Sequence, residues 1–393
     1  MRFKEFGTSN LEIVKFNEVV ESTLYGPRFN SNDYDLNGNV KTIRGTDISA
    51  NGTIKYDQVP IASIDSKVVE THKLGIGDIV MITTADCGMS GVFESQKYDF
   101  IASAYAVRIR LNNKAIPNYY KYYFQTWHSK KKIHSYVRKA TVANLPGADI
   151  LKVTTLCPSL PEQQKIADFL TIVDKKIQAL EKKKALLEQY KKGVMQKIFK
   201  QEIRFKQEDG SDYPEWEEKR LGELAIVTMG QSPSSTSYNN ENLGVPLIQG
   251  NADIIKRKTE PRQYTTEPTK KIAQGELIMT VRAPSGYIAK SYHNACIGRG
   301  VCSIGNSKGN LNYLYYYLLW FEPRWMQFEQ GSTFTAISGN DIRNLLINAP
   351  KDNEEQTNIA NFLTSIDNKL NSVLSQIDKT KMWKKGLLQQ MFV

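Results

Sequence analysis

Cysteine and histidine are scarce in this chain, and neither is placed like a metal ligand. The 393 residues include four cysteines and four histidines, and the cysteines are scattered without CxxC spacing. His293, Cys296 and Cys302 are close in sequence, but they do not match zinc spacings and a fourth ligand is missing. We expect no metal site, and reduced thiols suit a cytosolic protein.

Long apolar runs are also missing, and none approaches the length needed to cross a bilayer. The opening MRFKEFGTSN mixes charges and contains no apolar segment of the kind found in secretory signals. The expected location is therefore the cytoplasm.

The sequence lacks the common catalytic and phosphate-binding motifs. GxxxxGK[ST], GxGxxG, HExxH and GxSxG do not occur. The chain has no Pro-Pro pair, so it cannot carry the Asp/Asn-Pro-Pro-aromatic tetrad of amino-methyltransferases. Pro214, Glu217 and Lys219 faintly resemble a nuclease cluster, but a charged surface turn is the favoured interpretation. The sequence predicts a non-catalytic protein without a cofactor.

Acidic residues are outnumbered by basic ones. Lys and Arg total 52 against 41 Asp and Glu, which gives a formal net charge of +11. An excess of this size favours a nucleic-acid partner or an acidic surface, although charge alone decides nothing.

One long segment occurs twice. Residues 162–199 recur as residues 355–392 at a constant offset of 193, which indicates tandem duplication of a large unit. Apolar residues in each copy follow two lines of seven-residue steps, as a coiled-coil seam requires. The first copy has Ile166, Val173, Leu180, Leu187 and Val194 beside Leu170, Ile177 and Ile198, and the second has Ile359, Ile366, Val373 and Leu387 beside Leu363, Leu370, Ile377 and Met391.

Polar residues interrupt these seams, namely Lys184, Lys191, Thr380 and Lys384, as is typical of residues that determine register. The alternative is two ordinary amphipathic core helices. A helix of this length spans about 57 Å, so an antiparallel pair needs the simpler connection. We predict an α+β protein with two similar globular α/β units, separated by an antiparallel two-helix coiled coil with pseudo-twofold symmetry. The predicted parts are residues 1–157, 158–200, 201–350 and 351–393.

The two globular units have the same order of predicted elements. In the first unit we expect strands over residues 11–21, 40–49, 75–85, 105–111 and 151–157, a loop over 25–39, a helix over 118–137 and a turn over 147–150. The second unit is expected to match with residues 216–227, 229–240, 245–254, 274–284, an aromatic helix over 313–320, and residues 332–342. The loops diverge, which suggests that the two units bind different sequences.

Candidate DNA-binding residues lie in or beside polar loops at matching places in the two units. Arg commonly binds guanine and Asn or Gln binds adenine, whereas Lys and Ser mostly hold phosphates. The candidates are Arg28, Lys41, Arg44, Lys55, Arg138, Lys139 and Thr141 in the first unit, and Gln231, Ser232, Gln249, Asn251, Lys256, Arg257, Lys258, Thr333 and Thr335 in the second.

Aromatic residues at equivalent helical positions are candidate partner contacts. Tyr190 corresponds to Trp383, and Phe199 corresponds to Phe392. Two equivalent aromatic patches would bind two copies of one partner, since aromatic residues are favoured in interfaces. The alternative is that they pack against their own globular units.

Together these features resemble the DNA specificity subunit of type I restriction-modification systems. PSLPEQQKIADFL and PKDNEEQTNIANFL resemble the family's helical motif, while GQSPSSTSY and GVPLIQGNADI resemble the start of its target recognition domains. The second helical copy has one extra residue after its proline, and the first unit has Gly26-Pro27 in place of Gly-x-Ser-Pro.

The resemblance implies that each unit binds half of a split double-stranded DNA site and that the helices determine the gap. It also implies two methyltransferase subunits, which would use S-adenosylmethionine to methylate adenine, and restriction subunits that cleave DNA with ATP. None of that chemistry would lie in this chain. A stand-alone nuclease or methyltransferase fragment and an RNA-binding adaptor are the alternatives.

Overall fold

The computed structural model describes residues 3–7, 11–139, 141–325 and 336–392. The chain divides into two compact units, which are described separately: unit 1 comprises Met1–Glu181 and Ser375–Val393, and unit 2 comprises Lys182–Leu374. Two long helices, α5 (Leu160–Phe199) and α9 (Asn353–Met391), each contribute one part to each unit.

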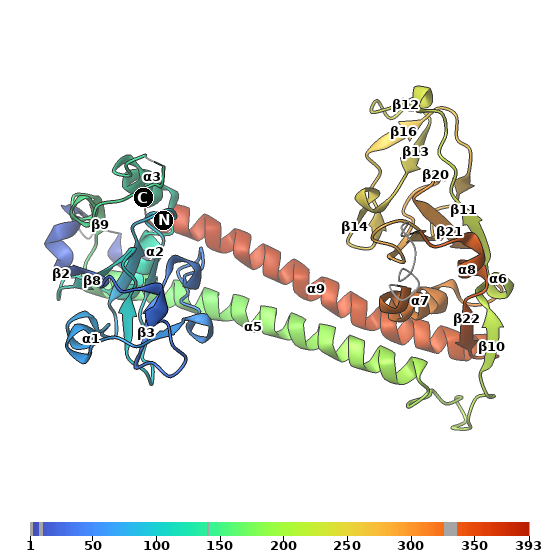
Figure 1. Cartoon of the computed structure of the whole chain (residues 1–393), viewed down its shortest axis with the longest axis horizontal. Coiled ribbons are helices and arrows are strands. Elements are labelled where there is room, and N and C mark those ends of the chain that lie inside the picture. The colour runs from blue at the N-terminus through green and yellow to red at the C-terminus, as the bar shows by residue number, and fades with distance from the viewer. Residues whose placement is uncertain (1–2, 8–10, 140, 326–335, 393) are drawn as a thin grey trace. The chain divides into compact units, whose positions relative to one another are not determined.

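Unit 1 is built on small sheets next to two short consecutive helices, of which the first is rich in tyrosine (Figure 1). One sheet has the order β2-β8-β5-β6, a second has the order β4-β3-β7, and β1 pairs with β9. The strands are β1 (Glu12–Lys15), β2 (Val20–Tyr25), β3 (Val40–Ile43), β4 (Ile61–Ala62), β5 (Ile79–Ile82), β6 (Ser90–Val92), β7 (Phe100–Ala102), β8 (Ala106–Leu111) and β9 (Thr154–Cys157). Its own α-helices are α1 (Ser66–His72), α2 (Pro117–Tyr123), α3 (Trp127–Ser135) and α4 (Gly147–Ile150).

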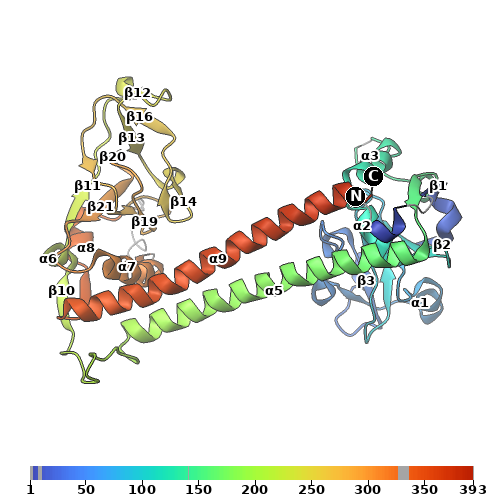
Figure 2. The ribbon, with the colours of Figure 1, turned by 180° about the vertical axis from the view of Figure 1, so that it is seen from behind.

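Unit 2 has two larger sheets, with the orders β11-β21-β18-β19-β15-β14 and β12-β16-β13-β20-β17, while β10 pairs with β22 (Figure 2). The strands are β10 (Glu217–Arg220), β11 (Ile226–Met229), β12 (Tyr238–Asn239), β13 (Val245–Ile248), β14 (Ile254–Ile255), β15 (Lys258–Thr259), β16 (Gln263–Thr265), β17 (Lys271–Ile272), β18 (Leu277–Thr280), β19 (Ile288–Lys290), β20 (Ala295–Ile297), β21 (Val301–Gly305) and β22 (Leu346–Ala349). Its α-helices are α6 (Leu221–Leu224), α7 (Leu311–Trp325) and α8 (Gly339–Arg343).

The main core of each unit joins a tyrosine-rich helix to both long helices. In unit 1, Tyr119 and Tyr120 of α2 are buried with Leu170 of α5 and Phe392 at the end of α9. In unit 2, α7 packs in the same way against Phe199 and the first part of α9. The apolar face of each long helix is therefore buried against the globular part of a unit as well as against the other helix.

The two long helices run antiparallel in each unit. In unit 1, Glu181 pairs with Lys381 and Asp174 pairs with Lys384, so the partner number on α9 rises as the number on α5 falls. In unit 2, Lys191 of α5 pairs with Asp367 of α9. The predicted direction of the helices is confirmed, and within both units the seam residues Ile166, Leu170, Ile359 and Leu363 are buried.

Two predicted elements of unit 1 are wrong in detail. The strand expected over residues 11–21 is interrupted by a 3-10 helix (Phe16–Val19), which turns the chain so that Phe16 and Val19 are both buried. The helix expected over residues 118–137 is two helices, α2 and α3. Thr126 separates them, because its hydroxyl accepts a hydrogen bond from the Ser129 amide and caps α3.

In unit 2 the element expected over residues 216–227 is also interrupted, because α6 separates β10 from β11. Several other predicted elements correspond to observed ones. The buried strand expected over residues 75–85 is β5, its repeat is β18, and the aromatic helix of unit 2 is α7. Among the helices that the structure describes, none is both long enough and apolar enough to span a membrane.

Candidate nucleic-acid interface

A small polar cleft of about 220 Å³ lies in unit 2 where three strands end. Ser232 follows β11, Gln249 and Asn251 follow β13, and Arg299 follows β20. Arg282 enters from the segment after β18. These loops pack closely because glycines line them: a Cβ added at Gly300 would lie 2.2 Å from the Gln249 carbonyl oxygen. The topology thus gathers polar side chains from four separate segments.

A buried carboxylate holds the loop that carries Gln249 and Asn251. Asp253 is 3% exposed, and its Oδ2 accepts hydrogen bonds from the amides of Gln249 (2.8 Å) and Gly250 (3.3 Å). Its Oδ1 accepts a 2.9 Å bond from Nε of Arg262. These hydrogen bonds fix the loop backbone, so the side chains of Gln249 and Asn251 line the cleft.

Arg282 and Arg299 are the cations of this cleft. Both residues are exposed, and neither guanidinium has a hydrogen bond or an ion pair within the described part of the chain. The Arg299 amide donates a 3.2 Å hydrogen bond to Oγ of Ser232, which orders the loop without using the guanidinium. A guanidinium can donate two parallel hydrogen bonds to guanine, whereas a carboxamide donates one hydrogen bond to N7 of adenine and accepts one from its N6 amino group. The cleft therefore offers polar groups suited to both purines.

In unit 1 the corresponding turn after β3 is arranged differently. Arg44 Nε and Nη2 bind the two carboxylate oxygens of Asp47 at 3.1 and 3.2 Å, and this hydrogen bonding raises the pKa of Arg44. Gln58 also donates to Asp47 and to the Thr46 carbonyl. A separate hollow of about 260 Å³ in unit 1 is lined by side chains that include Asp86, Lys130 and His134. The two units thus present unlike polar groups.

Within each unit, a lysine of one long helix pairs with an aspartate of the other long helix. In unit 1, Nζ of Lys384 lies 2.7 Å from Asp174, whose other oxygen accepts a 2.9 Å bond from the Tyr122 hydroxyl. The same hydroxyl oxygen lies 3.2 Å from Oγ1 of Thr171, from which it accepts, because its single proton goes to Asp174. Lys384 also lies 5.3 Å from the centre of the Tyr122 ring and donates to Gln125. The network ties α2 to both long helices.

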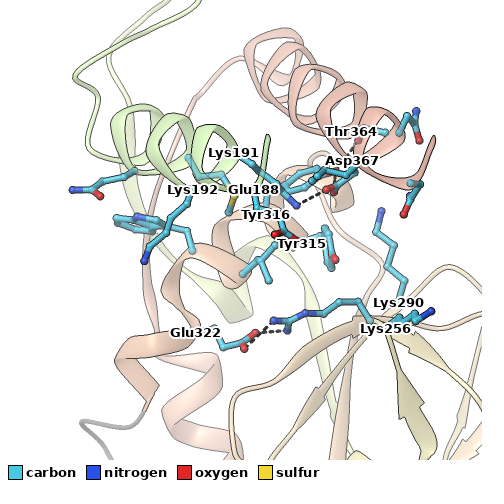
Figure 3. Close-up of a pocket in the computed structure, with 18 of the residues that line it drawn as sticks. Glu188, Lys191, Lys192, Lys256, Lys290, Tyr315, Tyr316, Glu322, Thr364 and Asp367 are labelled. Carbon is cyan, nitrogen blue, oxygen red and sulfur yellow. Dashed lines mark hydrogen bonds and ion pairs between the residues drawn. The ribbon is translucent and has the colours of Figure 1, made fainter. Parts of the chain in front are cut away.

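Unit 2 contains the same network at duplicated positions (Figure 3). Lys191 lies 2.6 Å from Asp367, and the Tyr316 hydroxyl donates to Asp367 at 2.8 Å and accepts from Thr364 at 3.2 Å. Burial raises the pKa of Tyr122 and of Tyr316. Two of the lysines that interrupt the predicted seam are therefore partners of carboxylates on the other long helix.

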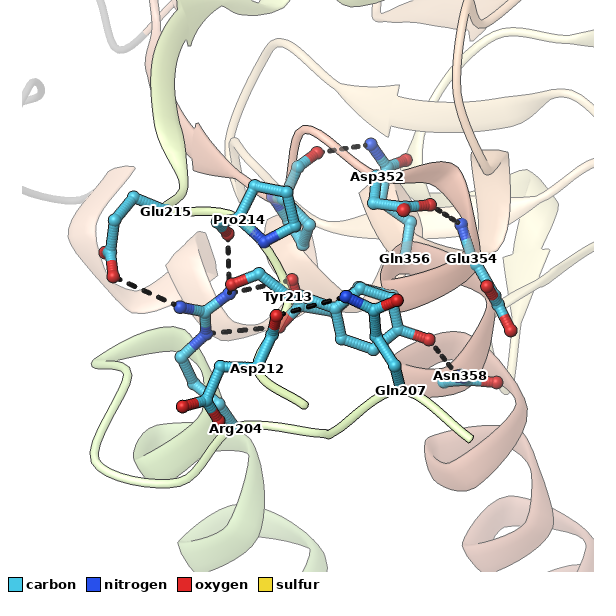
Figure 4. Close-up of polar contacts among 12 residues, drawn as sticks. Arg204, Gln207, Asp212, Tyr213, Pro214, Glu215, Asp352, Glu354, Gln356 and Asn358 are labelled. Atoms are coloured by element: carbon cyan, nitrogen blue, oxygen red, sulfur yellow. Dashed lines mark hydrogen bonds and ion pairs between the residues drawn. The ribbon is translucent and has the colours of Figure 1, made fainter. Parts of the chain in front are cut away.

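The repeated Glu-Gln pair connects the start of each long helix to its unit. In unit 2, Nε2 of Gln356 donates to the Pro350 carbonyl at 2.9 Å, and its Oε1 accepts from the Asn310 amide at 2.9 Å (Figure 4). Gln163 does the same in unit 1 with Pro158 and Ile116. The motif thus joins the chain entering the long helix to the segment before the tyrosine-rich helix.

The glutamate of this pair is buried in both copies. Glu355 accepts two hydrogen bonds from Arg204, at 3.2 and 3.0 Å, and Arg204 also donates to the carbonyls of Tyr213 and Pro214. Figure 4 shows Arg204 beside Glu215 and Pro214, with Asn358 bonded to Tyr213. The arginine therefore attaches the segment after α5 to the beginning of α9.

The family model for the type I restriction modification DNA specificity domain matches residues 8–189 and again residues 213–379. The two matches cover most of the chain and follow its internal duplication. The chain belongs to this family. It is thus placed among the DNA specificity subunits of type I restriction-modification systems.

Individual relatives agree with this placement. A putative type I restriction enzyme specificity subunit, MjaX of Methanocaldococcus jannaschii, is 29% identical over 342 residues, covering 84% of this chain and 80% of the relative. The HsdS subunit of Thermoanaerobacter tengcongensis has a TM-score of 0.52 at 23% identity, with 98% of both chains covered. The S subunit of M. genitalium has a TM-score of 0.63 at 14% identity, covering 100% of this chain and 99% of that one. The two structural likenesses concern the fold.

Some predicted DNA-binding residues of this specificity subunit already have partners. Besides Arg44, Lys41 donates to the Tyr56 carbonyl at 3.3 Å, and Arg257 binds Glu322. The Arg257 guanidinium also stacks over Tyr287 at 3.9 Å. Arg138 is exposed, with Asp149 at 3.6 Å. Arg257 therefore holds the β14–β15 hairpin against α7.

The remaining predicted residues are exposed or outside the description. Gln231 is exposed beside the cleft, and its carbonyl accepts a hydrogen bond from Thr269. Thr333 and Thr335 lie outside the described residues. The others are exposed, namely Arg28, Lys55, Lys139, Thr141, Lys256 and Lys258.

Sequence reasoning missed Arg282 and Arg299. The sequence pattern predicts a buried strand over residues 274–284, but β18 ends at Thr280 and Arg282 lies two residues beyond it. The glycines on both sides of Arg299 were the available signal, because close backbone packing leaves that side chain only the outer surface.

The four aromatic candidates for partner binding separate into two pairs. Phe199 packs on Tyr317 and Trp320 in unit 2, and Phe392 packs on Tyr119 in unit 1, with 4% and 3% of their surface exposed. These two phenylalanines belong to local cores, as the alternative interpretation expected. Tyr190 and Trp383 are 52% and 50% exposed.

Proposed function

We propose that this specificity subunit recognises a split, asymmetric DNA sequence, with each unit binding one half. Residues 1–157 and 201–350 would be the two target recognition domains, and residues 158–200 and 351–393 the two spacer helices. The cleft with Arg282, Arg299, Gln249 and Asn251 carries the proposal, because it presents two guanidinium groups without partners among the described residues beside two carboxamides, in a member of a DNA specificity family.

The half-sites should differ because the two units differ in their polar surfaces. Unit 2 has unpaired arginines in its cleft, whereas Arg44 of unit 1 is held by Asp47. Related frames with different surface groups favour two different base sequences.

The proposed partners are two methyltransferase subunits, bound at the duplicated helices, with restriction subunits in a larger complex. Support comes from Tyr190 and Trp383, which are large, half exposed and at equivalent positions. Methylation and cleavage would belong to those partners. The RNA-adaptor alternative predicts that RNA competes with duplex DNA for the chain.

The test is to map methylated adenines in cells that produce this chain with its methyltransferase subunit. Exchanging residues 1–150 for the same span of a relative should change one half of the methylated motif and leave the other half unchanged. Changes in both halves, or a palindromic motif from the natural chain, would refute independent recognition by two unlike units.

A further inference from the structure

A large cavity of about 980 Å³ lies within unit 2 (Figure 3). It is separate from the polar cleft that contains Arg282 and Arg299, which is called the recognition cleft from here on. Its walls come from α7, from the later part of α5, from the first part of α9, and from the β14–β15 hairpin. None of the residues lining the recognition cleft lines this cavity.

The acidic side chains of the cavity are all neutralised. Glu188 pairs with Lys184 at 3.2 Å, Asp367 pairs with Lys191 at 2.6 Å, and Glu322 pairs with Arg257. In contrast, several lining cations have no acidic partner among the described residues. They are Lys192, Lys200, Lys256, Lys258, Lys290 and Arg324.

Aromatic rings hold three of these cations in place. Lys258 and Lys290 each lie 4.6 Å from a ring centre, those of Tyr292 and Tyr315, and Arg324 stacks over Trp320 at 3.8 Å. Nη1 of Arg324 is buried without a hydrogen-bond partner among the described residues. The cavity thus presents positioned positive charges that no carboxylate of the described residues neutralises, and these charges attract an anion with several charges.

The path of the chain connects this cavity to the recognition cleft. Asn251 lines the cleft and Lys256 lines the cavity, and five residue steps span at most about 18 Å. A DNA strand has one phosphate about every 3.4 Å, so a strand bound at the cleft carries several phosphates over that distance.

Unit 1 does not repeat this lining. Gln125 and Lys121 of unit 1 take the places of Leu319 and Tyr315, and the backbone at Gly52 packs against both of their side chains. Two copies of one protein partner need two equivalent sites, whereas DNA with unlike half-sites does not. Because unit 1 does not repeat this lining, DNA is a better candidate for the ligand of the cavity than an acidic segment of a protein partner that binds in two copies.

We infer that this cavity binds the phosphate backbone of DNA beside the half-site recognised by unit 2, an inference that rests on the proposed function. Its lysines and Arg324 would add affinity without base preference, because phosphates carry no sequence information.

The test uses the full chain, a duplex with the mapped target, and a duplex whose unit 2 half-site is scrambled. The variant Lys192→Gln/Lys200→Gln/Lys256→Gln removes three unpaired charges. It should weaken binding to both duplexes by the same factor, and it should lower the slope of log affinity against log salt by about three.

The matched control is Lys182→Gln/Lys183→Gln/Lys197→Gln, which removes the same charge from exposed positions of α5 outside the cavity. It should change the slope by less than one. If the triple cavity variant does not fold, Lys256→Gln on its exposed turn gives the same test with a slope change of about one.

Other outcomes would overturn the inference. If the natural chain prefers its target but the cavity variant keeps affinity and slope, the cavity does not bind DNA, although the proposed function stands. If the variant loses only the methyltransferase subunit, the cavity binds protein. If ADP binds the cavity without competing with duplex DNA, the ligand is a free nucleotide. A natural chain that does not prefer its target contradicts the proposed function itself.

Discussion

At the scale of single residues, arginines paired with carboxylates hold the fold, whereas the unpaired arginines are those that the proposed function assigns to DNA. Arg44, Arg204 and Arg257 each bind a carboxylate, so their guanidinium groups maintain loop and hairpin geometry. Arg282 and Arg299 sit on loops fixed by backbone contacts, and their donors remain available. A donor that is already ordered and unpaired costs little to use in binding.

Replacing Arg282 or Arg299 with alanine should reduce discrimination at one base pair of the unit 2 half-site. Loss of a bidentate base contact is worth about 1–3 kcal/mol. The measurement is duplex binding by the full chain, comparing the target with single substitutions at each position.

Arg282→Lys is the matched control, since it keeps the charge but loses the planar pair of donors. A base-reading role predicts that lysine also loses discrimination. If lysine restores full discrimination, Arg282 contacts phosphate instead.

At the scale of elements, each tyrosine-rich helix is joined to the long helices by one lysine–aspartate–tyrosine network. The side chains of Lys384 and Asp174 are 8% and 12% exposed, and those of Lys191 and Asp367 are 15% and 27% exposed. A buried ion pair contributes little net stability, but breaking it leaves an uncompensated charge. The network therefore determines how a recognition unit attaches to its helices.

Asp174→Asn should lower the free energy of unfolding by about 3 kcal/mol, because Lys384 stays charged and buried. Asp367→Asn should cost less, since its pair is more exposed. The control is Glu181→Gln, whose partner Lys381 is 53% exposed, and it should cost under about 1 kcal/mol. Urea unfolding of the three variants gives the comparison, and equal costs for Asp174→Asn and Glu181→Gln would contradict the role of burial.

The same helices should make the protein sensitive to alkali. Burial raises the pKa of Tyr122 and Tyr316, so above about pH 10, the ordinary tyrosine pKa, the unfolded chain loses protons that the folded chain retains. The free energy of unfolding should therefore fall as the pH rises from 10 to 11. Burial lowers the pKa of Lys121 and Lys290, which acts in the opposite direction.

The variant Tyr122→Phe/Tyr316→Phe separates the contribution of these two tyrosines from that of the lysines. This variant should be less stable at pH 8, yet its stability should fall less steeply above pH 10, as measured by urea unfolding at each pH. A decline as steep as that of the natural chain would exclude these hydroxyls as its source.

At the scale of the whole molecule, the proposed function assigns two half-sites and two equal partners to the duplicated chain. If the paired helices determine the half-site spacing, adding one heptad to residues 182–188 and one to residues 375–381 lengthens them by about 10 Å. The methylated motif should then keep both half-sites and gain about three base pairs between them, at 3.4 Å per step. Methylome mapping is the measurement, and an unchanged gap in an assembled complex would contradict the proposal.

Tyr190→Ala/Trp383→Ala should weaken assembly with the methyltransferase subunit, because each change removes a half-exposed aromatic group from an equivalent site. Native mass measurement should show loss of the complex with two partner copies. Phe199→Ala/Phe392→Ala is the contrasting variant: it should lower thermal stability first, because both rings are buried. Undiminished assembly by the first variant would exclude Tyr190 and Trp383 from the interface.

The duplication, the two long helices and the family resemblance could be predicted from the amino-acid sequence, because seven-residue periodicity and repeated motifs are local patterns. The sequence also indicated the loops of the cleft, including Ser232, Gln249 and Asn251. It could not show that Thr126 divides residues 118–137 into two helices, since the aromatic pattern continues through the break.

Tertiary structure decided which polar residues are available for binding. Lys191 and Lys384 interrupt the seam in sequence, but only folding brings them to Asp367 and Asp174. Arg257 has Lys256 and Lys258 beside it in sequence, yet it alone of the three reaches Glu322 of α7. Partners this far apart along the chain are brought together by topology, and a linear pattern of charges does not contain that information.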